Sequence, residues 1–182
     1  MSLVAAADPV ASRVLAQRLV GRVHRVSKSI LRADADAADA AQQSLIEILT
    51  SAGTYRGGSS IERWSDRLVV RTSLRLARSR QKHRGRTADD AELDAIPVGD
   101  DAGPPLSDEA PRAIQAYLGD LPEVQRTALV LRHVMGYSVS EIAEITETSP
   151  NTVKDRLLRG SKEMRRLIRR DVAIGKATRG EA

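Results

Sequence analysis

The chain has 182 residues, enough for one ordinary domain or two small ones, and it carries 29 Lys and Arg against 24 Asp and Glu. The net charge of +5 and the pI of about 10.0 favour a polyanionic partner. There is no cysteine and only three scattered histidines, so disulfides and thiolate metal sites are excluded, and no metal or cofactor is expected. No apolar run reaches the roughly 18 residues of a membrane span, so we expect a cytoplasmic protein without membrane insertion.

Charge divides the chain into three blocks. Residues 1–84 have 15 basic and 7 acidic side chains, a net of +8, and residues 111–182 have 13 and 9, a net of +4. Residues 85–110 have 1 basic and 8 acidic side chains, a net of −7, and are rich in Gly, Pro and Asp. Such a composition cannot bury enough apolar surface to fold alone, so it predicts a flexible acidic linker. The predicted organisation is a domain of residues 10–84, the linker of residues 85–110, a domain of residues 111–170 and a tail of residues 171–182.

Helical periodicity fills the block before the linker. Three helices fit it, and no alternation typical of strands occurs in the chain, which predicts an all-α protein. The second helix follows the acidic stretch DADAAD, whose carboxylates suit a helix N-terminus. A capping box of Ser59 and Glu62 precedes the third, which runs to about His83. The expected apolar faces are Ala11, Leu15, Leu19, Val23, Val26 and Ile30 in the first helix, Ala38, Ala41, Leu45, Ile48 and Leu49 in the second, and Ile61, Leu68, Thr72 and Leu76 in the third.

The third predicted helix carries a row of basic side chains. At about 100° per residue, five of them fall within about 80° of one another, and Trp64 lies in the same arc. Like charges along one helix repel each other, so the row favours contact with phosphate over a solvated face, although acids on neighbouring helices could pair with some of them. The tryptophan could stack on an unpaired base or belong to the core. The row consists of Arg67, Arg71, Arg75, Arg78 and Lys82.

Two short helical patterns, separated by four residues, follow the linker. A capping box of Ser138 and Glu141 starts the first pattern, and Ser149 with Pro150 suits the start of the second. This spacing predicts a helix-turn-helix, whose second helix can enter a DNA major groove. The alternative is a tight helical corner with a solvated face, and Glu147 stands where the turn usually has glycine. The second helix would bury Val153, Leu157 and Met164 and expose Asn151, Thr152, Asp155 and Arg159, with Lys154 and Arg156 on its flanks.

Together these segments resemble a bacterial RNA polymerase sigma factor of the extracytoplasmic-function group, in the sigma-70-like family. The second helix, DAADAAQQSLIEIL, is similar to the family pattern of Asp-Ala-x-Asp, two small or apolar residues, Gln-Glu and an apolar run. The segment from LPEVQR to KEMRRL matches Leu-Pro-x-x-x-Arg, an apolar helix, a Gly-Tyr-Ser junction, Glu-Ile-Ala-Glu and a Thr-Val-Lys-x-Arg-Leu-x-Arg recognition helix. The resemblance covers residues 10–84 and 111–170.

The resemblance implies a non-enzymatic transcription initiation factor that binds core RNA polymerase and promoter DNA, and it indicates an anti-sigma factor as a further partner. The first domain would dock on polymerase and open the −10 element, and the second would read the −35 element. The implied polymerase-binding residues are Asp36, Asp39, Gln42 and Gln43. The implied −10 residues are Tyr55, Arg56, Trp64, Arg71, Arg75, Arg78 and Lys82. The implied −35 residues are Asn151, Thr152, Lys154, Arg156 and Arg159.

Three positions depart from the family pattern. The family usually has Glu where Gln43 stands, and Asn and Asp where Arg71 and Arg75 stand. The chain also has no Phe and only four aromatic residues, one Trp and three Tyr, so stacking for strand separation is sparse. Two alternatives stay open: a sigma mimic that binds an anti-sigma factor without initiating transcription, and a helix-turn-helix regulator whose first half senses a ligand. An enzyme is not expected, because no nucleophile elbow, phosphate-binding glycine loop or metal cluster stands out.

Overall fold

The computed structural model describes residues 1–83 and 113–180 of the chain. These residues form helices and connecting loops without a strand, which confirms the predicted all-α class. The chain divides into two compact units, Met1–Asp90 and Ala91–Ala182, and each is described by itself. The acidic linker predicted for residues 85–110 lies outside the described residues. None of the described helices is both long enough and apolar enough to cross a membrane.

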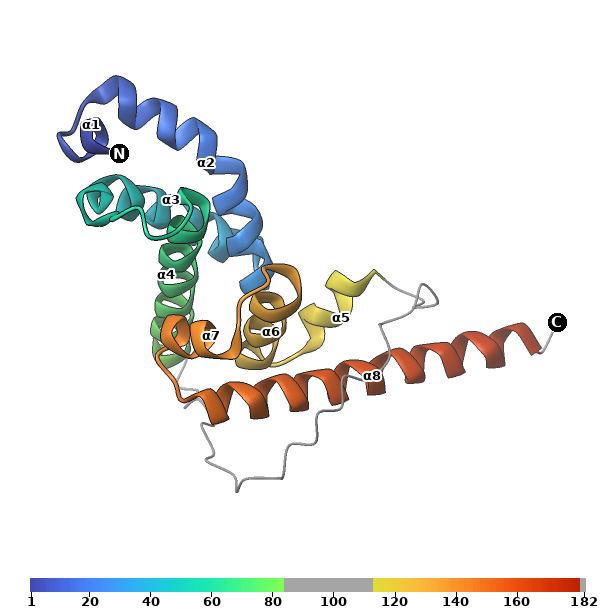
Figure 1. The fold of residues 1–182 in the computed structure, drawn as a ribbon. Coiled ribbons are helices and arrows are strands. Elements are labelled where there is room, and N and C mark those ends of the chain that lie inside the picture. Colours follow the sequence, from blue (N-terminus) through green and yellow to red (C-terminus); the bar gives the residue numbers. More distant parts are fainter. Residues whose placement is uncertain (84–112, 181–182) are drawn as a thin grey trace. The chain divides into compact units, whose positions relative to one another are not determined.

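Five helical elements make up the described residues of the first unit. Their bounds are α1 Ser2–Ala5, α2 Pro9–Ile30, α3 Asp34–Thr50, the 3-10 turn η1 Ala52–Thr54 and α4 Ile61–His83. The three long helices pack on one another in every pair (Figure 1). The short helix α1 packs on α2, α3 and η1, so the chain before α2 lies against the loop that leads to α4.

Helix α2 supplies the longest apolar face of this unit. The Asp8 carboxylate caps the helix by accepting a hydrogen bond from the Ala11 N–H at 2.7 Å. Pro9 occupies the first helical position, where no N–H is needed. Burial confirms the predicted face except at Ala11, which is half buried. Each large apolar side chain that is fully buried contributes about 1.5–3 kcal/mol to the stability of the fold. The buried apolar residues are Leu15, Leu19, Val23, Val26 and Ile30.

Helix α3 buries a stripe of small residues, which the periodicity predicted only in part. Ala41 and Ile48 are buried as expected, but Ala38 is exposed, and Leu45 and Leu49 are half buried. Helix α3 packs on both α2 and α4, and its buried arc is rotated from the predicted one toward the small residues Ala37, Ala40 and Ser44. The stripe comprises Ala37, Ala40, Ala41, Ser44 and Ile48.

The predicted apolar side of α4 was wrong in part. Thr72 is buried, but Ile61, Leu68 and Leu76 are only half buried. The buried side includes polar residues: Asp66 is bonded to α2, and Thr72 is bonded to α3. A prediction from apolar spacing does not detect such buried polar positions. The buried residues of α4 are Ser65, Asp66, Val69, Val70, Thr72, Ser73 and Leu74.

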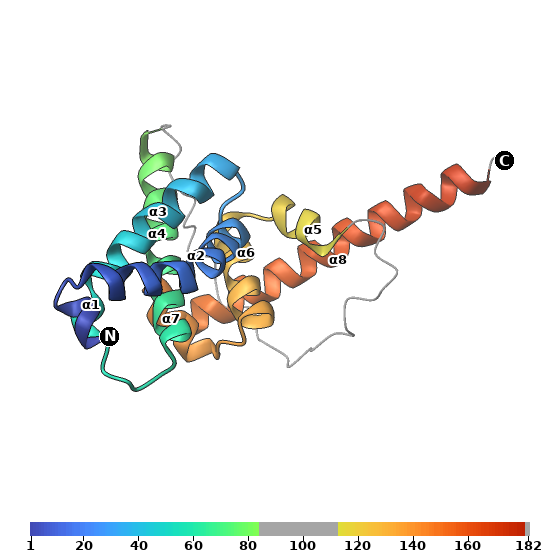
Figure 2. The same cartoon turned by 90° about the horizontal axis from the view of Figure 1, so that it is seen from above.

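Five further elements make up the part of the second unit that the structure describes. Their bounds are α5 Ile114–Asp120, α6 Glu123–Leu129, the π-helical turn η2 Val130–Val134, α7 Val139–Thr146 and α8 Pro150–Gly180. Helix α8 packs on α5, α6 and α7, and α5 lies beside it in both views (Figure 1 and Figure 2). The predicted buried side of α8 is confirmed at Val153 and Met164, while Leu157 is partly buried against the same core. The core cluster comprises Tyr117, Leu121, Leu129, Met164 and Leu167.

Helix α8 has two features that its sequence alone did not reveal. It continues to Gly180, beyond residue 170, where the predicted domain ends, because no proline interrupts it and its two internal glycines, Gly160 and Gly175, each cost only about 1 kcal/mol. Gly160 allows a close approach to α6, since a Cβ there would lie 3.0 Å from Leu129 Cδ1 and 3.3 Å from Gln125 Cβ. A larger side chain at this position would push the two helices apart.

Candidate nucleic-acid interface

Helix α7 begins at the predicted capping box. The Ser138 hydroxyl accepts a hydrogen bond from the Glu141 N–H at 3.3 Å, and the Glu141 carboxylate accepts one from the Ser138 N–H at 2.9 Å. Gly136 precedes the box with φ of 72°, a value at which glycine is favoured, and Tyr137 is buried. The Gly-Tyr-Ser junction therefore turns the chain sharply into α7.

The turn between α7 and α8 confirms the predicted helix-turn-helix. Glu147 ends α7 in the left-handed conformation, with φ of 56° and ψ of 44°, at a cost of about 1–2 kcal/mol for a residue other than glycine. The Thr148 N–H then donates to the Ala143 carbonyl at 3.0 Å. The Ser149 hydroxyl accepts from the Thr152 N–H at 3.0 Å and caps α8. These bonds fix where α8 starts relative to α7.

The five predicted reading residues lie together on the first three turns of α8. Asn151 and Lys154 are exposed, and Thr152, Arg156 and Arg159 are half buried. Val153, between them, is 1% exposed and packs this end of the helix into the unit. The outward face therefore presents an amide and an ammonium group on a rigid backbone, with the two arginines held closer to the protein.

Asp155 orients one of the two arginines. Its carboxylate accepts a hydrogen bond from Arg159 Nε at 2.8 Å, across one turn of the helix. The other guanidinium, that of Arg156, also has an interaction within the described residues. The sequence interpretation placed Asp155 on the outward face without a role, and the i to i+4 spacing was the available signal.

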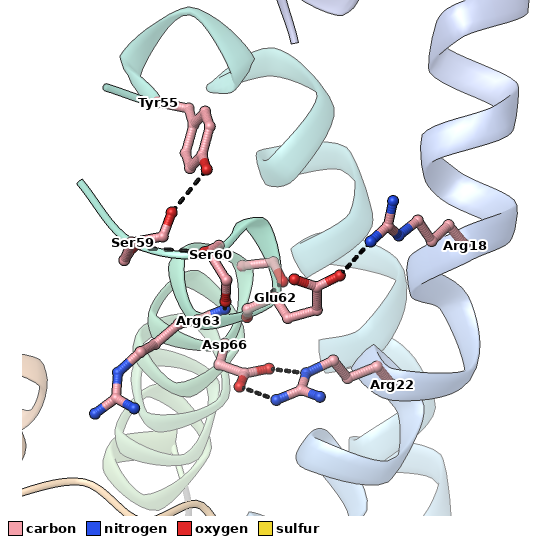
Figure 3. A network of polar contacts seen from close by, with 9 residues as sticks. Arg18, Arg22, Tyr55, Ser59, Ser60, Glu62, Arg63 and Asp66 are labelled. Atoms are coloured by element: carbon pink, nitrogen blue, oxygen red, sulfur yellow. Dashed lines mark hydrogen bonds and ion pairs between the residues drawn. The ribbon is translucent and has the colours of Figure 1, made fainter. Parts of the chain in front are cut away.

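Helix α4 begins one residue later than the predicted capping box. Ser60, not Ser59, is the cap: its hydroxyl accepts from the Arg63 N–H at 3.1 Å (Figure 3). The Ser59 carbonyl instead accepts from the Tyr55 hydroxyl at 2.7 Å. Glu62 does not complete a box, because its carboxylate accepts a hydrogen bond from Arg18 of α2 at 2.6 Å.

The aromatic residues predicted for strand opening are brought into contact. The rings of Tyr55 and Trp64 meet edge to face, with centroids 5.6 Å apart and an interplanar angle of 68°. Both are half buried, and Arg56, next to Tyr55, is exposed. Because the Tyr55 hydroxyl is bonded to the loop backbone, this loop holds the edge of Trp64 in place.

Two ion pairs fasten the start of α4 to α2. Arg22 donates to both oxygens of Asp66, from Nε at 2.7 Å and from Nη2 at 2.6 Å, and the Asp66 side chain is only 3% exposed (Figure 3). Arg18 and Glu62 form a second, more exposed pair one turn away. Neither pair was predicted, although the matching four-residue spacing of the two arginines and the two acids was a signal.

The carboxyl group of Glu62 is acidified by its surroundings. A hydrogen bond from its own backbone N–H lowers its pKa most, followed by the hydrogen bond from Arg18. Both favour the charged form. Glu62 therefore holds its charge, and its pairing with Arg18, to lower pH than an ordinary glutamate.

The basic row of α4 is partly neutralised by α3. Glu47 accepts hydrogen bonds from the Thr72 hydroxyl at 2.6 Å and from Arg75 Nη2 at 3.1 Å. Arg71 is exposed and has no partner among the residues that the structure describes, whereas Arg78 has one. The side chain of Lys82 is not among those that the structure describes. The predicted row is therefore not uniform: Arg75, which stands where the family usually has Asp, is bonded to Glu47 of α3, a pairing with a neighbouring helix of the kind that the sequence left open as an alternative.

The implied docking residues line the edge of α3. Asp36 and Asp39 both pair with Arg80 of α4, the second at 2.7 Å, while Gln42 and Gln43 are exposed. Ile46 follows on the same side of α3 and is 56% exposed, a large apolar side chain that the prediction omitted. Its i to i+4 relation to Gln42 was the signal in the sequence.

Comparison with known proteins covers both units. Residues 15–83 match the model of Sigma-70 region 2, and residues 112–164 match that of Sigma-70, region 4. The sigma factor SigV of Bacillus subtilis is 32% identical over 142 residues, which cover 78% of this chain and 81% of SigV. The ECF sigma factor SigM of Mycobacterium tuberculosis is 29% identical over 163 residues, or 90% of this chain and 80% of SigM.

Two solved structures share the fold. One is the sigma factor RpoE of Bartonella quintana in complex with the anti-sigma factor NepR, with a TM-score of 0.61, 17% identity and coverage of 86% of this chain and 96% of that one. The other is CnrH in complex with the cytosolic domain of CnrY, with a TM-score of 0.57, 17% identity and coverage of 93% and 95%. At this level of identity both describe the fold alone.

A region 2 unit followed by a region 4 unit with a helix-turn-helix defines a sigma-70-like initiation factor. The chain belongs to the extracytoplasmic-function group of RNA polymerase sigma factors. It is thus a non-enzymatic protein of promoter-specific transcription initiation, with core polymerase and promoter DNA as its partners.

Proposed function

We propose that the two units divide promoter recognition between them, the second reading the −35 element and the first docking on polymerase and opening the −10 element. The observation that carries this proposal is the outward face of α8, where Asn151 and Lys154 are exposed above the buried Val153. An Asn amide matches the donor and acceptor edge of adenine in the major groove, and a Lys ammonium binds phosphates or guanine. Thr152, Arg156 and Arg159 complete the −35 contacts.

The first unit opens the −10 element around the loop that precedes α4. The contact between Tyr55 and Trp64 offers an aromatic surface on which an unpaired base can stack, and Arg56 lies next to it. Arg71, Arg78 and Lys82 continue along α4 and attract the strand. Arg75 is partly neutralised by Glu47, so its contribution is smaller than the spacing of the row suggests.

Helix α3 provides the polymerase-docking surface. Gln42 and Gln43 are exposed, and Asp36 and Asp39 offer carboxylate oxygens that share the Arg80 guanidinium. Ile46 supplies an apolar contact between them and the end of the helix. Protein interfaces usually combine apolar contacts with polar ones, as this surface would.

The domains proposed for these roles are residues 10–84 and 111–170, joined by the linker of residues 85–110. The site of action is the cytoplasm, where bacterial polymerase transcribes. An anti-sigma factor is proposed as a further partner, supported by the two structural neighbours, both of them complexes with the proteins NepR and CnrY.

In vitro transcription tests this proposal. The purified chain is mixed with bacterial core RNA polymerase over a genomic promoter library, with core alone as the control. Discrete start sites that share −35 and −10 elements are expected only with the chain present. Absence of such start sites, together with tight binding to an anti-sigma factor, would favour the sigma mimic instead.

A further inference from the structure

Arg71 differs from its neighbours in the basic row of α4. It is exposed and has no hydrogen bond or ion pair within the described part of the chain, while Arg75 is bonded to Glu47 at 3.1 Å. Arg67 and Arg78 also have interactions with other residues. As far as the described residues go, Arg71 therefore keeps its guanidinium donors available for a ligand.

Arg71 lies in line with the aromatic contact of the first unit. Trp64 precedes it by seven residues, which on an α-helix is a separation of about 10 Å along the axis and about 20° around it. A DNA strand that stacks one base on Trp64 and then follows α4 would place another base over Arg71. At a stacked spacing of roughly 3.4 Å per nucleotide, that second base lies about three nucleotides further along the strand. The loop from Tyr55 to Ser60 and the two ion pairs between α2 and α4 hold the Trp64 end of α4 in place.

The chemistry of the free side chain points to one base. An arginine fork donates two parallel hydrogen bonds to O6 and N7 of guanine, whereas the Asn that the family usually has at this position matches adenine. We propose that Arg71 is a specificity-determining residue that selects guanine at one position of the −10 element. This inference rests on the proposed role of the first unit in −10 recognition.

A randomised promoter tests the assignment. Holoenzyme reconstituted from the chain and bacterial core polymerase transcribes a library with a fixed −35 element and a randomised −10 region. Wild type is expected to enrich guanine over adenine at one position on the order of tenfold. Arg71→Asn is expected to move that preference to adenine at the same position and leave the other positions unchanged. Arg13→Asn, an exposed arginine on α2, is the matched control and keeps the wild-type profile.

The outcomes separate this inference from the function on which it depends. If Arg71→Asn lowers transcription evenly and shifts no base preference, Arg71 contacts the backbone and the specificity assignment is overturned, while −10 opening by the first unit stands. If wild type starts transcription at no template, the proposed function fails and the inference fails with it. The fluorescence of Trp64, the single tryptophan of the chain, measures the binding of single-stranded DNA as a second readout. Strands that carry the guanine are expected to bind more tightly than strands with adenine at the same position.

Discussion

The reading face of α8 and the basic face of α4 are built in different ways. On α8, the bonds that shape the face join residues three or four apart, such as Ser149 with Thr152 and Asp155 with Arg159. On α4, the corresponding bonds join residues 25 to 44 apart, from Thr72 to Glu47 and from Asp66 to Arg22. The first surface therefore follows from a short stretch of sequence, while the second exists only once three helices have packed. Substitutions on the reading face of α8 should affect DNA reading alone, and substitutions around α4 should affect both folding and binding.

Loss of the buried ion pair should have the largest effect on stability. Arg22→Met leaves the Asp66 carboxylate, 3% exposed, without its counterion, and we expect a loss of about 3 kcal/mol, the low end of the range because Arg22 itself is 40% exposed. Urea unfolding followed by Trp64 fluorescence measures it. Arg18→Met, which breaks the exposed pair, is the matched control and should cost less than about 1 kcal/mol. Equal losses in the two variants would contradict the role assigned to burial.

The opposite pattern is expected in α8, where a variant should lose binding without losing stability. Asn151→Ala removes an exposed amide and should weaken recognition of the −35 element by about 2 kcal/mol, because a bidentate base contact provides about 1–3 kcal/mol of discrimination. Fluorescence anisotropy with labelled promoter duplexes measures it, beside a thermal melt of each protein. Lys162→Ala, an exposed change further along α8, should retain selectivity. Unchanged selectivity in Asn151→Ala would show that another face of the unit reads DNA.

Docking through α3 should show a smaller effect. Asp39→Lys reverses a charge at the proposed polymerase surface and should weaken binding to core polymerase by about 1 kcal/mol, as expected for an exposed ionic contact. Titration of labelled chain with core polymerase measures it. Arg80→Gln is the control, because it breaks the pairs of Arg80 with both Asp36 and Asp39 and leaves the two carboxylates in place. A loss as large in Arg80→Gln would mean that the pair, and not the docking charge, produces the effect.

The smallest expected effect is on pH dependence. Because the folded chain lowers the pKa of Glu62, the stability from its pairing is fully present above the ordinary glutamate value of 4.5 and is lost as pH falls through the lower, folded pKa. Glu62→Gln should therefore remove part of the acid-induced loss of stability. Urea midpoints of the two proteins measured between neutral pH and about pH 3 test this. Parallel midpoints throughout that range would exclude a contribution from Glu62.

The sequence predicted local features well and tertiary ones poorly. The capping box of Ser138 and Glu141 and the turn at Glu147 were correct because their hydrogen bonds join near neighbours. The start of α4 was misplaced by one residue because Glu62 is drawn to Arg18 on another helix. Pairing of the basic row with acids on neighbouring helices was left open, but the particular pair of Arg75 and Glu47 could not be predicted, since two surfaces that are far apart in sequence meet there. Individual DNA and polymerase contacts stay predictions.

Chemical footprinting of the open complex tests the division between the units most directly. Holoenzyme is bound to one of its own promoters, DNase protection is mapped across the −35 element, and permanganate reports unpaired thymines at the −10 element. Trp64→Ala should keep the −35 protection and lose the reactive thymines, while Asn151→Ala should lose the −35 protection. Normal melting by Trp64→Ala, or intact −35 protection by Asn151→Ala, would contradict the assignment of opening to the first unit and reading to the second.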